Sequence, residues 1–183
     1  MSKNLNRLFN LIITRLTKGI LTIPAPDNWF ITVIMLVFYS LIALPIGLYF
    51  GFLKFGWAQL TLGDFFTVVG ICLFAPAITE ELFFRVLLLP HITEEVTKIR
   101  KMLWGCISLA IFIVYHPLNA LTAYPAGNPT FMNVIFLFQA GVLGIICTVA
   151  YLQSGSLWPS VIMHWIIVVV WLVLFGGYEK LST

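Results

Sequence analysis

The chain has 183 residues, of which 61% are hydrophobic and only 9% carry a charge. Soluble domains carry about 25% charged residues, so this composition excludes a water-soluble domain and predicts an integral membrane protein. The length allows one membrane domain without a second folded unit. The net charge of +3 is small and the chain has no phosphate-binding loop, so no nucleic-acid partner is expected.

Residues 1–28 predict a cytoplasmic arm formed by an amphipathic helix on the membrane surface. Arg15 and Lys18 interrupt any apolar core, and no small-residue cleavage site follows, so a signal peptide is not expected here. Its apolar residues recur at helical spacing, as in helices that lie in the interface. They are Leu5, Leu8, Phe9, Ile12, Ile13 and Leu16, and the basic residues are Lys3, Arg7, Arg15 and Lys18.

Five apolar stretches follow, each compatible with the ~20 residues that a membrane span needs. The chain is therefore predicted to be all-α: a polytopic membrane helical bundle of about five transmembrane helices plus the N-terminal amphipathic surface helix. Between the spans, residues 117–130 contain three prolines and predict a loop or re-entrant stretch. The expected spans are 29–53, 65–90, a third from just before 102 to 115, 131–153 and 160–175, within a membrane domain at 29–176 and before a tail at 177–183.

The basic residues predict the orientation in the membrane. The N-terminal arm holds four Lys or Arg, and the loop after the second span holds Lys98, Arg100 and Lys101. Only Lys54 and Lys180 lie on the opposite side. A cytoplasmic N-terminus puts seven positive charges inside and two outside, as the positive-inside rule requires.

Three charged residues, Glu80, Glu81 and Arg85, interrupt the second predicted span. A charge at membrane depth costs about 2.5–3.5 kcal/mol on insertion scales, so the cluster predicts a functional site. Glu81 and Arg85 are four residues apart and are expected to pair on one helix face. Glu80 points about 100° away and stays free to act as a general base or a metal ligand. The alternative is that the three charges only hold helices together.

Two histidines in other apolar segments favour a shared site with Glu80. His116 ends the run FIVYHP, and His164 lies near the start of the fifth span. His91, beside Pro90 in a charged loop, is expected to be solvent-exposed. A rise of about 1.5 Å per residue along straight, upright helices does not bring Glu80, His116 and His164 to one depth, so convergence requires tilted helices or a deeper start of the third span.

These residues resemble the motifs of the CAAX-protease and bacteriocin-processing (CPBP, or Abi) family of intramembrane endopeptidases, which is related to the type II CAAX prenyl endopeptidases. The run from Glu80 to Arg85 fits EExxxR, and the run from Phe112 to His116 fits FxxxH. His164, after the turn GSLWPS, fits a third motif centred on His. The resemblance covers residues 64–175.

The resemblance implies an intramembrane endopeptidase that cleaves membrane-associated peptides or proteins without a covalent acyl-enzyme. Glu80 and His116 would activate a water, and His164 would donate to the oxyanion. Supporting residues would be Glu81, Arg85 and Phe112. The family further implies a bacterial plasma membrane, or a cyanobacterial or plastid membrane. The substrate's identity and a partner subunit that completes the cavity are left open.

The chain departs from the family pattern four residues after His164, where Val168 replaces the usual Asn. Valine cannot donate a hydrogen bond, and loss of an oxyanion donor elsewhere costs about 2.7–4 kcal/mol. An alternative function is therefore a non-catalytic membrane scaffold or chaperone that retains the peptidase fold. Four polar residues are candidates for a substitute donor: Asn119, Asn133, Gln139 and Trp165.

The sequence is also compatible with two other chemistries. Glu80, His116 and His164 could serve as zinc ligands, two His and one carboxylate with a position open for water. A site without metal or other cofactor is favoured, since no acidic residue is near either His in sequence to orient it as a ligand. A small ion carrier using Glu80 and Arg85 is disfavoured, because the chain shows no internal repeat.

Overall fold

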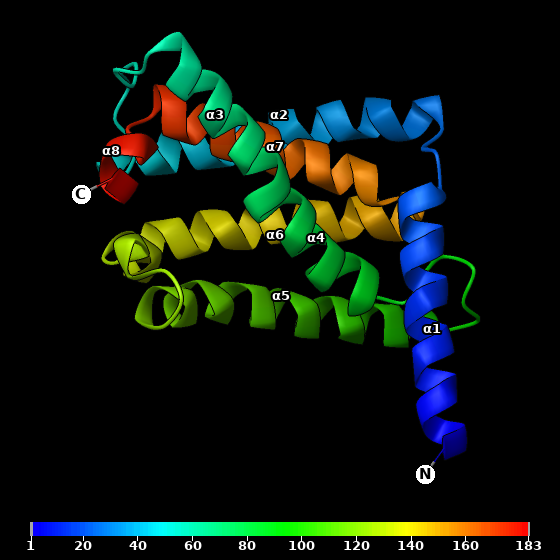
Figure 1. Ribbon diagram of the computed structural model, residues 1–183. Coiled ribbons are helices and arrows are strands. Elements are labelled where there is room, and N and C mark those ends of the chain that lie inside the picture. The colour runs from blue at the N-terminus through cyan, green and yellow to red at the C-terminus, as the bar shows by residue number, and fades with distance from the viewer. Residues whose placement is uncertain (1, 183) are drawn as a thin grey trace.

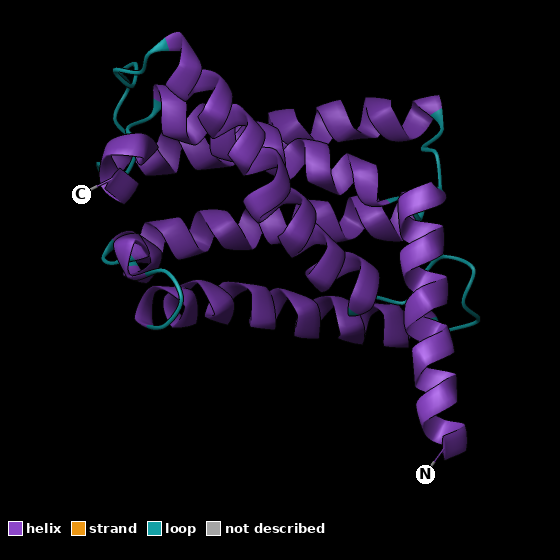
Figure 2. Cartoon of the chain, viewed as in Figure 1, coloured by secondary structure: helices purple, strands orange, loops and turns teal. Residues whose placement is uncertain are grey.

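The computed structural model describes residues 2–182, and side chains for residues 4–181. These residues contain no β-strand, only one isolated bridge between Gly56 and Phe175. Figure 2 shows helices joined by loops that gather at the two ends of the molecule. Five stretches are long and apolar enough to cross a membrane: α2 (Pro26–Tyr49), Leu62–Leu87, α5 (Lys98–Leu121), α6 (Val134–Ser154) and α7 (Leu157–Leu174). The predicted all-α membrane bundle is confirmed.

The second span is broken in its middle. It consists of α3 (Leu62–Cys72), two wide π-helical turns, η1 (Leu73–Ile78) and η2 (Leu82–Leu87), and the short α4 (Thr79–Glu81) between them. Ala75 leaves the helical conformation, with φ −134° and ψ 106°. The cause is Pro76, which lacks an N–H and crowds the helical conformation of the residue before it. The half that carries Glu80 therefore takes a new direction, and the whole segment crosses the bundle diagonally (Figure 1).

The third span is longer than expected, and the predicted loop at 117–130 begins too early. Helix α5 continues through Pro117 to Leu121, so His116 lies inside a helix rather than at its end. The connection to α6 then holds two short helical turns, η3 (Pro125–Gly127) and η4 (Thr130–Met132). The first span differs in the opposite direction, since α2 ends at Tyr49 before Gly51, which has a positive φ of 67°.

The amphipathic helix α1 (Ser2–Leu21) runs across one end of the bundle, nearly at right angles to the spans (Figure 1). Arg15 joins it to the loop after the second span, donating to both carboxylate oxygens of Glu94 at 2.7 Å and to the Leu87 carbonyl at 2.8 Å. Trp158 at the start of α7 donates to the Ile20 carbonyl at 2.9 Å. Leu5, Leu8 and Phe9 remain exposed, as expected for a helix that meets lipid.

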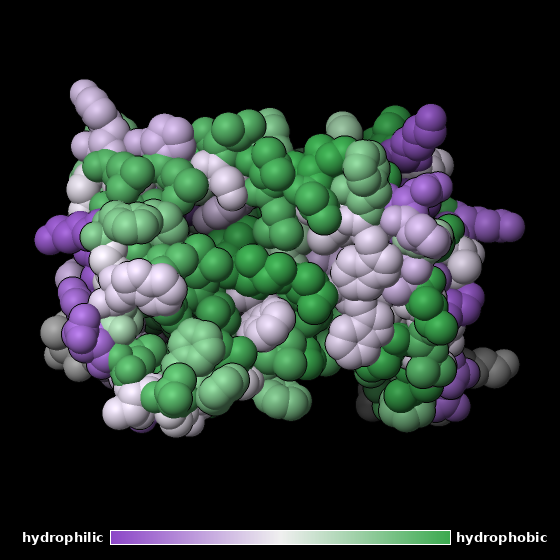
Figure 3. Space-filling model, turned by 90° about the horizontal axis from the view of Figure 1, so that it is seen from above, coloured by the Kyte–Doolittle hydropathy of each residue, from purple (hydrophilic) through white to green (hydrophobic). Residues whose placement is uncertain are grey.

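Helix α6 is the most deeply buried span and contacts α2, α5 and α7. Small residues allow these close approaches: a Cβ at Gly144 would lie 2.6 Å from Leu109 Cδ1 of α5. The chain closes with the short α8 (Gly177–Ser182) at the end opposite α1. Figure 3 shows an apolar belt across the middle of the molecule, with hydrophilic residues concentrated towards its two ends, as a membrane-spanning bundle requires.

Candidate functional site

Glu81 is the centre of a fully buried charge network. Its Oε2 lies 3.1 Å from Nε of Arg85, the partner expected from the four-residue spacing, and both side chains are 0% exposed. Its Oε1 lies 2.8 Å from Nδ1 of His164 on α7. The Arg85 guanidinium also sits 4.8 Å from the centroid of the Phe112 ring. The Glu81 carboxylate therefore links the second span to the fifth through His164. The Arg85 guanidinium contacts the third span through Phe112.

The contact with Glu81 fixes the orientation and the tautomer of His164. An ionised carboxylate only accepts hydrogen bonds, so Nδ1 of His164 carries the proton that it donates to Glu81. In the neutral ring, Nε2 then bears a lone pair. That Nε2 lies 3.9 Å from Oε2 of Glu80. His164 is thus held between two carboxylates, and its Nε2 can donate only when the ring carries both protons.

Glu80 has surroundings unlike those of Glu81. It follows the break at Pro76, and its side chain is 13% exposed. It lines a cavity of about 570 Å³, to which Glu81 does not contribute. Neighbouring carboxylates on one helical turn therefore face in different directions, as their spacing predicts.

His116 reaches the same cavity from α5. Its Nδ1 lies 2.8 Å from the carbonyl of Phe112, one turn earlier. A carbonyl oxygen only accepts, so Nδ1 carries the proton and Nε2 is an acceptor. The ring packs edge-on against Phe112 and Phe136, with centroids 4.8 and 5.2 Å away. These contacts hold the imidazole in one orientation.

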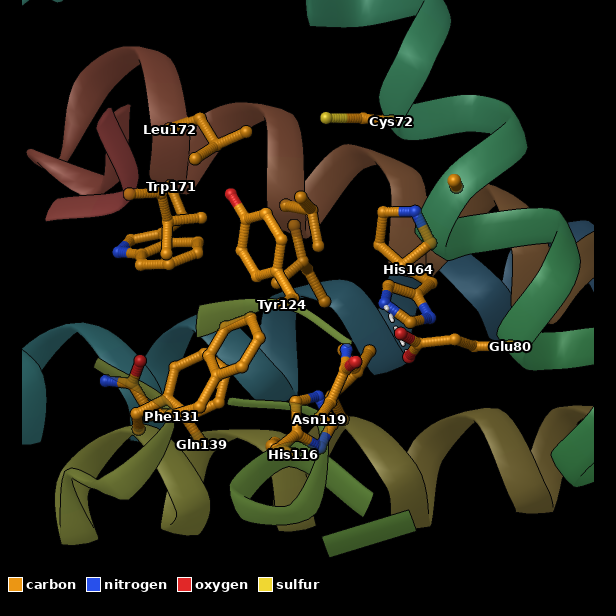
Figure 4. A pocket seen from close by; sticks show the side chains of 18 of the residues that line it. Cys72, Glu80, His116, Asn119, Tyr124, Phe131, Gln139, His164, Trp171 and Leu172 are labelled. Carbon is orange, nitrogen blue, oxygen red and sulfur yellow. Dashed lines mark ion pairs between the residues drawn. The ribbon is translucent and has the colours of Figure 1, made fainter. Parts of the chain in front are cut away.

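The structure brings Glu80, His116 and His164 to one cavity, although straight helices would not. The break at Pro76 and the diagonal course of the second span account for the difference, whereas the third span does not start deeper than expected (Figure 1). Figure 4 shows Glu80, His164, His116 and Asn119 gathered at one side of the cavity, whereas Trp171 and Phe131 lie at the other. The cavity thus has a polar side, set by charged residues, and an aromatic side.

The zinc alternative can be compared with the side-chain positions. Within the part of the chain that the structure describes, no group of three or more His, Cys, Asp or Glu is placed so that it could hold a metal ion. Glu80, His116 and His164 share the cavity, but they do not form a ligand set in this arrangement.

The four candidates for a donor in place of Val168 have different positions. Asn133 caps the start of α6, and Trp165 donates to a carbonyl of α3 at 2.8 Å; neither lines the cavity. Gln139 lines it, but its amide donates to a carbonyl of α2 at 3.0 Å. Asn119 lines the cavity, and its side chain makes no hydrogen bond to another described residue.

Two features of this region differ from, or go beyond, what the sequence predicts. His91, expected to be solvent-exposed, is buried: Nε2 lies 3.0 Å from the Gly155 carbonyl and Nδ1 2.9 Å from Thr93 Oγ1. The reason is that α1 and the turn before α7 close over its loop.

The aromatic side of the cavity, including Tyr124 and Phe131, carries no sequence signal, since an apolar chain has aromatic residues throughout.

The fold and the cavity together define a class: a polytopic membrane protein with ionisable side chains converging inside its spans. A profile of the type II CAAX prenyl endopeptidase Rce1-like family matches residues 61–170, which include every residue of the motifs described above. The chain belongs to this family of membrane proteases. Neither a curated protein nor a solved structure matched the chain in the corresponding searches.

Proposed function

We propose that the protein is an intramembrane endopeptidase in which Glu80 activates a water that hydrolyses a peptide bond directly. The observation that supports this most strongly is the shared cavity of Glu80, His116 and His164, which come from three different spans. Ionisable residues at membrane depth are costly and mark functional sites. Here two of them also have their ring orientation set by a hydrogen bond at Nδ1.

The roles follow from the donors and acceptors that each side chain presents. The Nε2 lone pair of His116 accepts a hydrogen bond from the water, and Glu80 takes the water proton as oxygen attacks the carbonyl carbon. Glu80 then returns this proton to the leaving amine. His164, when doubly protonated, donates from Nε2 to the oxyanion. Glu81 and Arg85 are positioning residues, since they contact His164 and the helices rather than the cavity, and Phe112 orients His116.

The substrate in this proposal is a membrane-associated peptide or protein. The aromatic side of the cavity suits an apolar portion of such a substrate, because it is lined by Phe131, Phe136 and Trp171. The scissile bond would lie on the polar side beside Glu80. The arm and the loop at 88–97 lie at the same end of the bundle and therefore share one side of the membrane, which the positive-inside rule makes the cytoplasm. The membrane in this proposal is the bacterial plasma membrane, or a cyanobacterial or plastid one.

The mechanism proposed here uses no metal. In the alternative mechanism, Glu80, His116 and His164 would bind a zinc ion. Catalytic zinc sites in other proteins use similar sets of His and carboxylate ligands. A chelator separates the two, because only a zinc enzyme loses activity when the metal is removed.

The test is cleavage of a quenched membrane-peptide library by purified protein in detergent. Glu80→Gln removes the base and is expected to abolish cleavage, whereas Glu95→Gln, the same change in the exposed loop, is expected to cleave like the wild type. A chelator is expected to have no effect, and loss of cleavage on chelation would favour zinc. Wild-type activity in Glu80→Gln contradicts the proposal. No cleavage by the wild type would favour the non-catalytic scaffold, for which Val168 is the supporting feature.

A further inference from the structure

Peptide-bond hydrolysis needs a hydrogen-bond donor at the carbonyl oxygen, where negative charge develops in the transition state. On α7, Val168 lines the cavity one turn beyond His164 and has no donor. His164 commits its Nδ1–H to Glu81, so its neutral form has no donor left for the oxyanion. Beside Glu80, the fifth span therefore supplies a donor only while His164 is doubly protonated. The other α7 donor that lines the cavity, the unpaired Nε1–H of Trp171, belongs to the opposite, aromatic side (Figure 4), so a second donor must come from another element.

Asn119 is placed to be that donor. It lies three residues after His116 on α5, and residues at this spacing share a helix face. It is half-buried and lines the cavity. Its side-chain amide makes no hydrogen bond with any other described residue. The two N–H groups that donate to Asn119, those of Thr122 and Tyr124, bond to its backbone carbonyl. Figure 4 shows it on the same side of the cavity as Glu80 and His164.

The other polar groups of the cavity fit this role less well. The hydroxyl of Tyr124 points towards Leu172 and away from His116 (Figure 4). The Gln139 amide donates to the Ala43 carbonyl. Tyr115 is one residue before His116 and so lies about 100° around the helix from it, with its ring packed against Phe84 at 5.5 Å.

We propose that Asn119 is a catalytic residue whose Nδ2–H stabilises the oxyanion; this rests on the proposed function. Water oxygen bonds to the carbonyl carbon, the π pair moves to the carbonyl oxygen, and Glu80 takes the proton. Asn119 donates a hydrogen bond to that oxygen without transferring its proton. The C=O bond then re-forms, the C–N bond breaks, and the amine nitrogen takes the proton from Glu80. An amide donates in the same way whatever the protonation state of His164.

The test compares kcat and KM of Asn119→Ala and Asn119→Asp with the wild type on one cleaved peptide. Both variants are expected to lose about 10²–10³ in kcat with KM unchanged, the effect of removing one oxyanion donor. Asn119→Asp keeps the side-chain shape but replaces the donor with an acceptor, so it remains informative if the alanine variant folds poorly. Tyr115→Phe removes the neighbouring hydroxyl and is expected to stay within a few-fold of the wild type.

The outcomes separate this proposal from the proposed function. A wild-type kcat in Asn119→Ala, or a loss confined to KM, overturns the role of Asn119 while Glu80→Gln remains inactive. A large loss of kcat in Tyr115→Phe would assign the oxyanion donor to Tyr115 and so would also overturn the role of Asn119. If Glu80→Gln cleaves like the wild type, or the wild type cleaves nothing, the proposed function fails, and the oxyanion role fails with it.

Discussion

Glu80 and Glu81 are adjacent in the sequence, but they have opposite surroundings. The Glu81 side chain is fully buried between Arg85 and His164. Glu80 faces the cavity and keeps some exposure. Because one carboxylate belongs to a buried ion pair and the other faces the cavity, we expect substitutions of the two to separate stability from activity.

We expect Glu81→Gln to lower the stability of the protein far more than Glu80→Gln. Removing one partner of a buried ion pair costs about 3–5 kcal/mol, because the remaining charge, here Arg85, stays buried without its counter-ion. The measurement is the midpoint of thermal unfolding in detergent. Glu80→Gln should keep a near-wild-type midpoint while cleavage is lost. Equal midpoints for the two variants would contradict this assignment of Glu81.

The sequence predicts only part of this residue-level network. Spacing within one helix predicts that Glu81 meets Arg85, because four residues make about one turn. The bond from His164 to Glu81 joins positions 83 residues apart. Such a contact depends on how the spans cross, and neither periodicity nor composition encodes the crossing. The hydrogen bond that fixes the tautomer of His164 therefore becomes visible only in the structure.

At the scale of elements, α1 is held at one end of the bundle by polar contacts and by the packing of Leu16 and Gly19 against the core. We expect Arg15→Ala to loosen α1, because it removes hydrogen bonds to Glu94 and to the Leu87 carbonyl. Hydrogen bonds to charged groups contribute about 1.5–3 kcal/mol. Hydrogen exchange of the α1 amides should become faster, with Arg7→Ala, exposed on the same helix, as the control. Unchanged exchange in Arg15→Ala would contradict a role for Arg15 in holding the helix.

The loop at 88–97 should make stability depend on pH through His91. Burial lowers the pKa of His91 below its ordinary 6.5, and Lys18 and Arg15 of α1 act in the same direction, against the Gly155 carbonyl and Glu94. Protons therefore bind more readily to the unfolded state, so this contribution is complete above pH ~6.5 and is lost as pH falls towards the folded pKa.

The test of this pH dependence is the unfolding midpoint of the wild type and His91→Gln between about pH 5 and pH 7, the range in which histidine titrates. The wild type should lose stability on acidification, and His91→Gln should lose less. His116 and His164 are present in both proteins, so the difference isolates His91. Parallel curves would contradict a role for His91.

Two prolines show why helix boundaries were only partly predictable. Pro76 breaks the second span at Ala75, but α5 runs through Pro117. A proline inside a helix costs about 3 kcal/mol in either place. In α5, Phe112, His116 and Ala120 recur every four residues and are all buried, so packing on both sides of Pro117 maintains the helix. The local sequence predicts the free-energy cost of a proline in a helix, but it does not predict the tertiary packing that offsets this cost.

At the scale of the whole molecule, the distribution of positive charge predicts the direction of insertion. Seven Lys or Arg belong to the arm and to the region from 98 to 101, and only Lys54 and Lys180 belong to the other end. Arg85 is excluded from this count because it is buried beside Glu81. With five candidate spans, an odd number, we expect the two ends of the chain on opposite sides of the membrane.

We therefore expect a reporter fused to the arm to stay in the cytoplasm and one fused after α8 to lie outside. Replacing Lys98, Arg100 and Lys101 with Gln leaves four positive charges against two and should produce a mixed orientation, because the bias depends on this difference. The same change at Lys54 and Lys180 should strengthen the original orientation and serves as the control. An outside arm in the wild type would reverse the proposed topology and place the loop that holds α1, with His91, on the outer surface.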